Sequence, residues 1–332
     1  MDLDLVFLGT SGSAPTARRA PTALLVRRGG ERLLFDCAEG TQRQLMRSAI
    51  GLPDLDEIFI THLHADHYLG LPGMLKTFAL RQRDTPLTVY GPSGLRDLYS
   101  SLGRVFGKLS YPVHIEELRA GTELKRNEYR ILAFPVDHGV SAVGYALVED
   151  ERPGRFDVEK AEALGIPPGP ERGALQRGET VTLADARVIT AETVVGVPRP
   201  GRRVVIPGDT APTETVRVLA EGADVLVHEA TFADEDADRA AETMHSTARQ
   251  AAEIAEAADV RLLALTHVSP RYLGSDLLRE AREVFADTVL PRDFDTIEVP
   301  FAERGAPRLV KGGALPDPAV REPLYPASAQ PL

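Results

Sequence analysis

Five short apolar segments of this chain each run into a histidine or an acidic residue. They are residues 60–67 (ITHLHADH), 134–138, 204–209, 225–229 and 263–267. Short runs rich in Val, Ile, Leu and Phe are typical of β-strands. Polar groups at the ends of several strands meet at one rim of a sheet, where they form a pocket. The pattern therefore predicts a sheet-based fold with one polar site at its rim.

Residues 60–67 have the composition and spacing of a metal site. In extended backbone, side chains two residues apart lie on the same side, so His62 and His64 converge on one ion. A turn into a helix then redirects Asp66 and His67 toward a second ion. Imidazole and carboxylate are donors that zinc accepts. A run of surface or capping histidines is the alternative, but three of the chain's eight histidines within six residues favour the metal site.

Ten segments are predicted to be strands, and four stretches between them have helical spacing or capping signals. The predicted strands are residues 4–8, 22–26, 33–35, 57–60, 87–90, 131–136, 142–148, 203–206, 225–227 and 262–265. The predicted helices are residues 68–82, 213–221, 246–258 and 275–286, with Thr213 and Ser246 as N-caps. Strands in pairs with helices between them are typical of an α/β domain whose sheets are covered by helices.

Composition and the positions of proline and glycine divide the chain into three parts. Its 332 residues are 43% apolar and 26% charged, which is enough to form a large core. Residues 150–178 are polar and contain four prolines and five glycines, so they are predicted to project as an arm. Residues 313–332 contain five prolines and are predicted to be a frayed tail. The prediction is one domain over residues 1–312, with the arm inserted and the tail appended.

The net charge of −11 is unevenly distributed. Residues 1–130 hold 17 Lys and Arg against 15 Asp and Glu, a net of +2, whereas residues 131–332 hold 21 against 34, a net of −13. The first part is compatible with a basic face that contacts a nucleic acid. An acidic, solvated surface explains the same numbers, and charge alone favours it.

Three features predict a cytoplasmic protein that does not cross a membrane. No apolar run approaches the roughly 18 residues of a spanning helix. The first residues, MDLDLVFLGT, carry acidic groups where an export signal carries positive charge. Cys37 is the only cysteine, which excludes an internal disulfide and a Cys-clustered metal site.

Longer motifs resemble those of the metallo-β-lactamase superfamily and, within it, the ribonuclease Z family. The HxHxDH block of residues 62–67 is shared across the superfamily. The narrower resemblance rests on FLGTSGSAP at 7–15, FDCAEGTQRQL at 35–45, VHEATF at 227–232, MHST at 244–247, THVSPRY at 266–272 and IPPGP at 166–170. It covers residues 1 to about 300.

The resemblance implies an αββα sandwich, in which two facing mixed β-sheets are flanked by helices. It also implies two zinc ions per subunit and endonucleolytic removal of the 3′ trailer from precursor tRNA, which leaves a 3′-hydroxyl. The implied ligands are His62, His64 and His138 for one ion, Asp66, His67 and His267 for the other, and Asp209 as the bridge. Asp66 is also the implied base, and His245 the general acid that protonates the leaving 3′ oxygen.

Further roles follow from the same resemblance. His228 and Glu229 are expected to orient His245 or a ligand. The expected tRNA contacts are made to phosphate, by Arg271 near the scissile bond and by Arg152, Arg155, Lys160, Arg172 and Arg177 on the arm. The family usually works as a homodimer, so the arm of one subunit is expected to act on tRNA held by the other.

One motif departs from the family pattern. The family's Pro-x-Lys-x-Arg-Asn loop is Pro15-Thr16-Ala17-Arg18-Arg19-Ala20 here. Because Ala17 and Ala20 replace the Lys and the Asn, recognition of the mature tRNA 3′ end at these two positions does not carry over.

Three other functions are compatible with the fold. A phosphodiesterase or arylsulfatase acting on small esters shares every metal ligand but needs neither His245 nor the arm. A non-catalytic nucleic-acid-binding relative usually shows broken ligands, and none is missing here. A di-iron oxygen reductase of the same fold is expected to have Glu in place of His64.

Overall fold

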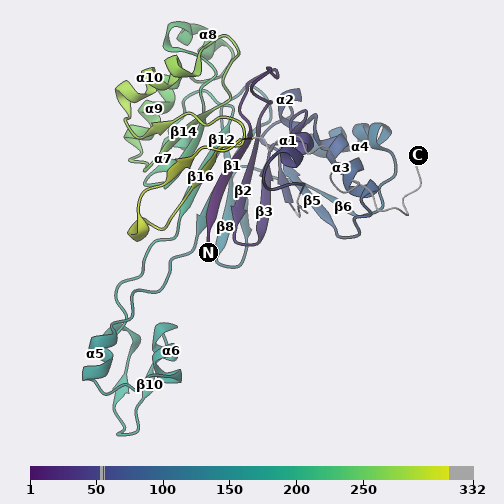
Figure 1. The fold of residues 1–332 in the computed structure, drawn as a ribbon. Helices are drawn as coiled ribbons and strands as arrows, with labels where there is room; N and C mark the ends of the chain where they lie inside the picture. The colour runs from purple at the N-terminus through teal and green to yellow at the C-terminus, as the bar shows by residue number, and fades with distance from the viewer. Residues whose placement is uncertain (53–54, 56, 314–332) are drawn as a thin grey trace.

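The computed structural model describes residues 1–52, 55 and 57–313. These residues form two facing β-sheets with helices on the outer face of each, and an arm projects from one end (Figure 1). The chain therefore has the expected αββα arrangement. The predicted tail, residues 313–332, lies outside the described residues apart from Gly313.

Within the described residues, the first sheet is mixed and has eight strands. Its order is β17 (Arg308–Val310), β16 (Thr296–Glu298), β1 (Leu3–Gly9), β2 (Ala23–Arg28), β3 (Glu31–Phe35), β4 (Glu57–Phe59), β5 (Leu87–Gly91) and β6 (Val113–Glu117). The pairs from β17 to β3 are antiparallel, and the pairs from β3 to β6 are parallel.

The second sheet of the described chain is also mixed and has seven strands. Its order is β15 (Thr288–Val289), β14 (Leu263–Thr266), β13 (Val225–Glu229), β12 (Arg203–Gly208), β9 (Val143–Glu149), β8 (Tyr129–Pro135) and β7 (Glu123–Lys125). β12, β13 and β14 are parallel, and β9 is antiparallel to both β12 and β8. The C-terminal ends of β8, β12, β13 and β14 therefore lie at the same edge.

Helices cover the outer face of each sheet because each carries one apolar side. The helices on the first sheet are α1 (Thr41–Arg47), α3 (Leu71–Leu80) and α4 (Leu95–Phe106). The helices on the second sheet are α7 (Glu214–Ala220), α9 (Ala248–Ala257) and α10 (Gly274–Val284), with the short α8 (Ala237–Glu242) before α9. No helix in the described part of the chain is long and apolar enough to cross a membrane.

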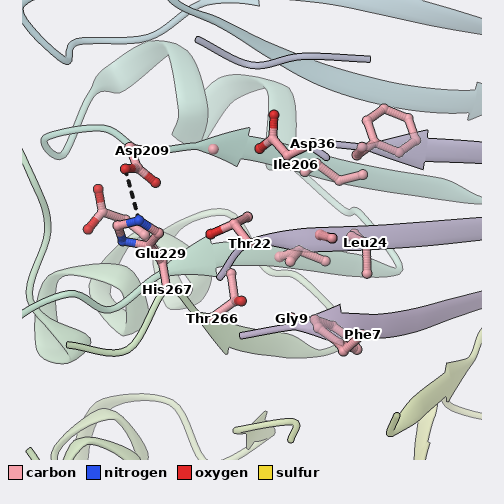
Figure 2. Close-up of a pocket in the computed structure, with 14 residues that line it drawn as sticks. Phe7, Gly9, Thr22, Leu24, Asp36, Ile206, Asp209, Glu229, Thr266 and His267 are labelled. Carbon is pink, nitrogen blue, oxygen red and sulfur yellow. Dashed lines mark ion pairs between the residues drawn. The ribbon is translucent and has the colours of Figure 1, made fainter. Parts of the chain in front are cut away.

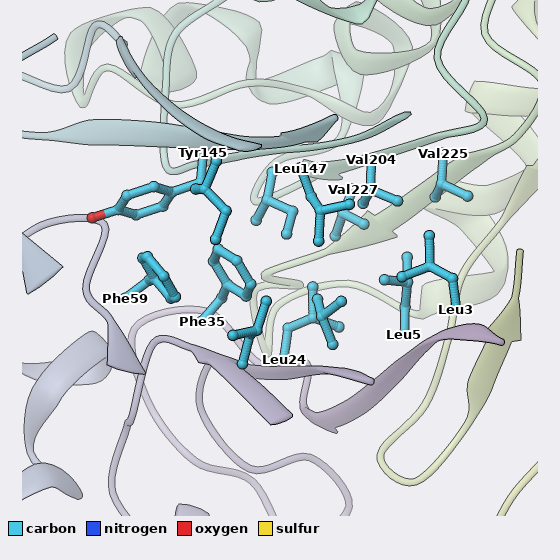
Figure 3. Packing of buried hydrophobic residues seen from close by; sticks show 14 of the residues in the cluster. Leu3, Leu5, Leu24, Phe35, Phe59, Tyr145, Leu147, Val204, Val225 and Val227 are labelled. Carbon is cyan, nitrogen blue, oxygen red and sulfur yellow. The ribbon is translucent and has the colours of Figure 1, made fainter. Parts of the chain in front are cut away.

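The space between the sheets is filled by apolar side chains from alternate strand positions (Figure 3). Phe35 stacks on Phe59 with their ring centres 4.9 Å apart, and the Tyr145 ring meets both edge-on. The Tyr145 hydroxyl donates to the carbonyl oxygen of Ile60 at 2.8 Å. This bond joins the two sheets directly before residues 60–67, so the core fixes the position of that segment.

All ten predicted strands are present. Sequence analysis did not predict α1 or the twelve-residue α4, and the predicted helix 68–82 is divided between α2 (Ala65–Tyr68) and α3. The other differences lie in short strands and in one cap. The pattern missed β6, β7, β15, β16 and β17, because two to five residues with partly exposed side chains carry little periodicity. The prediction that Ser246 caps the helix 246–258 is wrong. Thr247 is the N-cap of α9 and forms a capping box with Gln250, whereas the Ser246 hydroxyl donates to the Thr210 carbonyl at 2.7 Å.

The arm extends to about residue 201 rather than ending at residue 178. Its elements are α5 (Val158–Ala163), α6 (Pro170–Gln176), β10 (Val181–Thr182), β11 (Val188–Ile189) and the 3₁₀ turn Ala191–Thr193. The residues after 178 belong to the arm because they complete its small core. That core consists of Ala161, Ile166, Leu175, Val181, Leu183, Ile189 and Val194. Its members are too widely spaced to form a periodic pattern, so the sequence did not predict it.

The neck of the arm is bound to the body through Arg152. Arg152 forms a β-bridge with Arg199 on the returning chain. Its guanidinium pairs with Glu303 at 2.9 Å and lies 3.5 Å from the centre of the Phe301 ring. Both contacts hold Arg152 against the body, so its guanidinium is already paired with a carboxylate.

A buried carboxylate lies where the neck enters the second sheet. Glu149 ends β9 and is only 5% exposed at its side chain. It accepts from Arg202 at 2.7 Å and from Arg28 at 2.9 Å. Burial opposes ionisation of Glu149, but the hydrogen bonds and charge of Arg202 outweigh it and lower the pKa of this carboxyl. Glu149 therefore joins the first sheet, through Arg28, to both strands of the neck.

We expect Glu149→Gln to lower the free energy of unfolding by about 3–5 kcal/mol, because it removes the counter-charge of the buried Arg202 and leaves the buried Arg28 with only its exposed partners Glu31 and Glu128. Since the pKa of Glu149 is lower in the folded state, its stabilisation is complete above the unfolded pKa of about 4.3 and is lost as pH falls through the folded value. Urea unfolding from pH 7 down to acid pH measures both effects.

Glu128→Gln is the matched control for this measurement. Glu128 also pairs with Arg28, at 3.5 Å, but its side chain is 64% exposed. Exposed ion pairs contribute about 1 kcal/mol or less. Equal losses for the two variants would contradict the role assigned to the buried pair.

Candidate metal centre

The strand ends of both sheets deliver their polar side chains to one rim. β4 leads into His62 and His64, and the chain then turns into α2 (Ala65–Tyr68). The ends of β8, β12, β13 and β14 are followed by or contain His138, Asp209, Glu229 and His267. The backbone N–H of Val143 donates to the carbonyl of Thr61 at 2.9 Å, which joins the two sheets at this rim.

His62, His64 and His138 form the first cluster. The Nδ1 atom of His64 lies 2.9 Å from Nε2 of His62 and 3.1 Å from Nε2 of His138. Tetrahedral nitrogen ligands at zinc distances lie about 3.3 Å from one another. Burial lowers the pKa of His62, so its ring is held neutral, the form that binds a metal.

Asp66, His67 and His267 form the second cluster. The Oδ2 atom of Asp66 lies 3.3 Å from Nε2 of His267 and 3.8 Å from Nε2 of His67. His67 and His267 are buried, whereas Asp66 is partly exposed and accepts from the backbone N–H of Ser13 at 2.7 Å.

Asp209 lies between the two clusters. Its Oδ2 atom is 3.1 Å from His267 and 3.4 Å from His67, and Figure 2 shows this carboxylate beside the His267 ring. The rings of His62 and His138 lie 3.9 Å from the same oxygen. Burial opposes its ionisation, but the neighbouring imidazoles hold the pKa of Asp209 well below its usual range. Four imidazole rings therefore surround one buried carboxylate.

Hydrogen bonds fix the ring orientation of each buried histidine in the two clusters. The Nδ1–H of His67 donates to Asp36 Oδ2 at 2.8 Å, and that of His138 donates to the carbonyl of Met244 at 3.0 Å. The hydroxyl of Thr61 receives the Nδ1–H of His62, and the hydroxyl of Thr231 receives that of His267, because each hydroxyl donates to a carboxylate. Each Nε2 lone pair is thereby left for a ligand.

The residues fit a divalent metal ion. The Nε2 atom of His67 is buried and has no hydrogen-bond partner among the described residues. Buried polar atoms without partners are rare in folded proteins, and here the neighbouring groups are the imidazole and carboxylate donors of both clusters. The clusters of His and Asp at this rim are therefore able to bind metal.

Sequence analysis missed Asp36, Thr61, Thr231 and Met244, which orient the histidines. Asp36 carried a usable signal, because it follows the strand 33–35 and β3 is parallel to β4. Its carboxylate therefore reaches the same rim, where it also accepts from Thr61 N at 2.8 Å. Thr231 and the Met244 carbonyl belong to loops and carried no such signal.

His245 lies beside both clusters and is held by Glu229. Its Nδ1 atom is 2.8 Å from Glu229 Oε1 and 4.0 Å from Asp209 Oδ2. Burial lowers the pKa of His245, but the hydrogen bond and charge of Glu229, with Asp209 and Asp66 beyond, raise it overall to about 9. Glu229 is therefore the neighbour that most favours the charged form of His245.

His228 does not lie where the sequence placed it. Its Nδ1 atom bonds to the carbonyl of Glu229 at 2.9 Å, and its ring is buried beside Glu229 without a hydrogen bond to His245 or to either cluster. Alternation along β13 explains this position, because Val227 and Glu229 point to one face of the sheet and His228 to the other.

Comparison with known proteins identifies the family. The chain is 50% identical over 311 residues to the ribonuclease Z of Natronomonas pharaonis, covering 91% of this chain and 100% of that protein. It is 48% identical to the ribonuclease Z of Myxococcus xanthus, covering 91% and 99%. The chain belongs to the ribonuclease Z family.

Structural comparison agrees with this membership. The short form of human tRNase Z is 28% identical, with a TM-score of 0.65 over 90% of this chain and 99% of that one. The metallo-β-lactamase fold protein YhfI from Bacillus subtilis also has a TM-score of 0.65, at 18% identity, which supports the fold. A family profile described as anti-Pycsar protein Apyc1 matches residues 3–130.

The basic residues expected to contact tRNA differ in whether their side chains are exposed or already bonded within the protein. Arg271 and Arg155 are exposed, as is Lys160 on α5. Arg172 donates to the carbonyl of Ile166 at 2.9 Å within the arm. The guanidinium of Arg177 pairs with Glu179 at 2.7 Å, and that of Arg152 is bound at the neck.

Because Asp36 orients His67, we expect Asp36→Asn to weaken metal binding by about 10–100-fold in this ribonuclease Z family member. The Asn oxygen accepts from Thr61 N, which places its NH₂ against His67 Nδ1. The proton of His67 then moves to Nε2, the atom that faces Asp209 and Asp66. Competition with a metal-sensitive chelator measures the affinity. Asp137→Asn is the control, since Asp137 is exposed beside His138, and equal losses would rule out the tautomer argument.

Proposed function

We propose that this protein is a zinc-dependent endoribonuclease that removes the 3′ trailer from precursor tRNA and leaves a 3′-hydroxyl. Its family membership supports the substrate class. The observation that carries the proposal is the position of His245, an imidazole whose Nδ1 lies 2.8 Å from Glu229 Oε1 beside the His and Asp side chains that could hold metal. A site with this residue has both an anion-binding centre and a proton donor for a poor leaving group.

The proposed metal ligands divide into two sets that share Asp209. His62, His64 and His138 would hold one zinc ion, and Asp66, His67 and His267 the other. Zinc ions in such a pair lower the pKa of water toward neutrality and neutralise charge on a phosphodiester. Two ions per subunit is the number proposed for these two sets.

The chain's own residues supply the proton transfers. The Asp66 carboxylate is held by the backbone N–H of Ser13 at 2.7 Å. It orients the attacking water and accepts its proton. His245 donates a proton to the departing O3′ while Glu229 stabilises its charge and fixes Nδ1.

A His245→Ala variant tests this assignment. A nucleotide 3′ oxygen leaves as an alkoxide that requires protonation, so precursor-tRNA cleavage should fall by about 10²–10⁴-fold. A nitrophenolate leaves unaided, so hydrolysis of bis(p-nitrophenyl) phosphate should fall much less. A 5′-labelled precursor tRNA, with and without chelator, maps the cut and gives the rate.

His114→Ala is the control for a lost imidazole, since His114 is exposed on β6. Wild-type rates on precursor tRNA with His245→Ala would overturn the general-acid role and favour a small-ester hydrolase. A wild-type protein that leaves precursor tRNA intact would overturn the proposed function itself.

We propose that the arm contacts the tRNA body and that the protein works as a cytoplasmic homodimer. The arm leaves from the end of β9 and the start of β12, the sheet edge opposite to the one that carries Asp209 (Figure 1). The position supports an arm that serves a substrate held by the partner subunit. Residues 150–201 contain seven basic and nine acidic residues, so a grip on phosphate depends on individual side chains, of which Arg155 and Lys160 are free of ion pairs in the described structure.

Replacing residues 153–198 by a short Gly/Ser linker tests the arm while keeping the bridge between Arg152 and Arg199. We expect KM for precursor tRNA to rise and hydrolysis of bis(p-nitrophenyl) phosphate to persist, because the catalytic rim lies at the other end of the sheet. Arg155→Ala/Lys160→Ala should reproduce part of the KM effect. The control Arg177→Ala/Arg187→Ala removes arginines already paired with Glu179 and Asp185. Equal loss on both substrates would show a structural arm.

A further inference from the structure

The loop that carries His245 is bound to the rim of the metal centre by a tyrosine. After β13 the chain forms the 3₁₀ turn Asp234–Asp236 and then α8, and it reaches His245 three residues beyond that helix. The Tyr272 hydroxyl donates to the carboxylate of Asp236 at the end of the turn. We propose that Tyr272 is a positioning residue that, through Asp236, holds His245 where it can protonate the departing O3′. The inference rests on the proposed function and names a residue that places its proton donor.

The His245 loop, residues 233–245, is an excursion that is closed at its base. Phe232 forms a β-bridge with Thr247, directly before and after the loop. Within the loop the buried residues are Ala233 and Ala240, so little apolar surface holds it to the second sheet. A segment with few buried apolar contacts opens easily. The position of the His245 loop therefore depends on its polar contacts.

Tyr272 belongs to a well-anchored part of the rim. It follows His267 by five residues, and its ring packs against the apolar cluster between the second sheet and its helices. The backbone N–H of Val268 donates to the Thr10 carbonyl at 3.0 Å, and that of Gly12 donates to the Val268 carbonyl at 3.1 Å. Gly12 lies so close to His267 that a Cβ at position 12 would be 2.7 Å from its Nδ1. Tyr272 therefore shares a firmly packed segment with a proposed metal ligand.

The bond from Tyr272 to Asp236 joins this segment to the start of α8. Burial, together with the hydrogen bond and charge of Asp236, raises the pKa of Tyr272 to about 12, so the hydroxyl keeps its proton and donates it. Hydrogen bonds to an ionised acceptor are about twice as strong as those between neutral groups. Asp236 is the residue directly before α8, at its N-cap position. The bond therefore fixes the point at which this helix begins.

The backbone carries this position from α8 to His245. The N–H of His245 donates to the Ala240 carbonyl at 2.8 Å. Met244, the residue before His245, has a φ of 55°, a left-handed conformation that residues other than glycine rarely adopt. Such strain persists only where the surrounding structure holds the residue on both sides. Glu229 holds the imidazole of His245, and Tyr272 holds the helix that precedes it.

A second polar contact of the His245 loop has a different character. Asp234, at the first position of the 3₁₀ turn, is exposed and pairs with Arg249 at 3.2 Å, while its N–H donates to Glu280 at 3.0 Å. Exposed ion pairs contribute little to stability because water competes for both charges. The Tyr272 contact involves a partly buried ring and lies nearer to His245 along the chain, so we assign the positioning role to it.

The test is Tyr272→Phe in the zinc-loaded, full-length protein, because this change keeps the ring and removes the hydroxyl. We expect kcat for precursor tRNA to fall about tenfold with little change in KM, since a misplaced proton donor slows the chemical step. Hydrolysis of bis(p-nitrophenyl) phosphate and the zinc content should stay near the wild-type values. Asp236→Ala should reproduce the loss. Asp236→Asn should restore most of the rate, because its side-chain oxygen still accepts from Tyr272.

A precursor tRNA with sulfur in place of O3′ at the cut separates positioning from a structural effect. A thiol has a pKa of roughly 8.5, far below that of an alcohol, so a thiolate leaves without receiving a proton. Tyr272→Phe and His245→Ala should therefore cleave the sulfur substrate at close to the wild-type rate. On the oxygen substrate, the double variant should be no slower than His245→Ala alone, because Tyr272 acts through His245.

Tyr111→Phe and Asp238→Ala are the matched controls. The Tyr111 hydroxyl donates to the Leu75 carbonyl at 3.0 Å beside the first sheet, and Asp238 is exposed on α8. Both controls should cleave the two substrates at wild-type rates. A Tyr272→Phe variant that matches Tyr111→Phe, that loses activity equally on the oxygen and sulfur substrates, or that loses zinc would overturn the inference and leave the proposed function intact. A wild-type protein that does not cleave precursor tRNA would overturn the proposed function, and this inference with it.

Discussion

The rim of the sandwich depends on one buried negative charge. Asp209 lies within 4 Å of four imidazole rings and is almost inaccessible to water. An isolated carboxylate at such depth is costly, so its neighbours must supply compensating charge or hydrogen bonds. The strand register meets this requirement, because β8, β12 and β14 end at one edge and β4 delivers residues 60–67 from the opposite sheet. The convergence of strand ends from both sheets therefore places four imidazole rings around the Asp209 carboxylate.

The sequence predicted the elements with strong periodicity or unusual local composition. The ten core strands were found because each is a short run rich in Val, Ile, Leu and Phe, and residues 60–67 were found because three histidines and an aspartate follow such a run. The cap of α9 was misplaced by one residue, since Ser and Thr at 246 and 247 are equivalent in sequence and only the bond from Ser246 to Thr210 separates them. The predicted arm ended too early, at residue 178, because the residues of its small core are widely spaced in the sequence. The position of the His228 ring was also not predicted. The side of the sheet to which a side chain points depends on the register of the strand, and the motif around His228 does not reveal that register.

Charge is distributed by function rather than evenly over the surface. At the neck, Glu149 and Glu303 form ion pairs with arginines of the neck strands, so charged residues there connect the arm to the body. Beside the metal centre, by contrast, the guanidinium groups of Arg18, Arg43 and Arg47 have no carboxylate partner in the described chain. The sum over residues 1–130 is close to neutral and conceals this contrast. Net charge by segment is therefore a poor guide to where an anion binds, and the partner of each side chain is a better one.

The contact between Gly12 and His267 has a consequence for how variants of this protein would be interpreted. Glycine at position 12 carries no chemistry, yet any side chain there would press on an imidazole of the centre. In a saturation-mutagenesis screen, position 12 would score like a catalytic residue although glycine supplies no reacting group. Intolerance to substitution at position 12 thus reports the lack of space beside His267 rather than a chemical role.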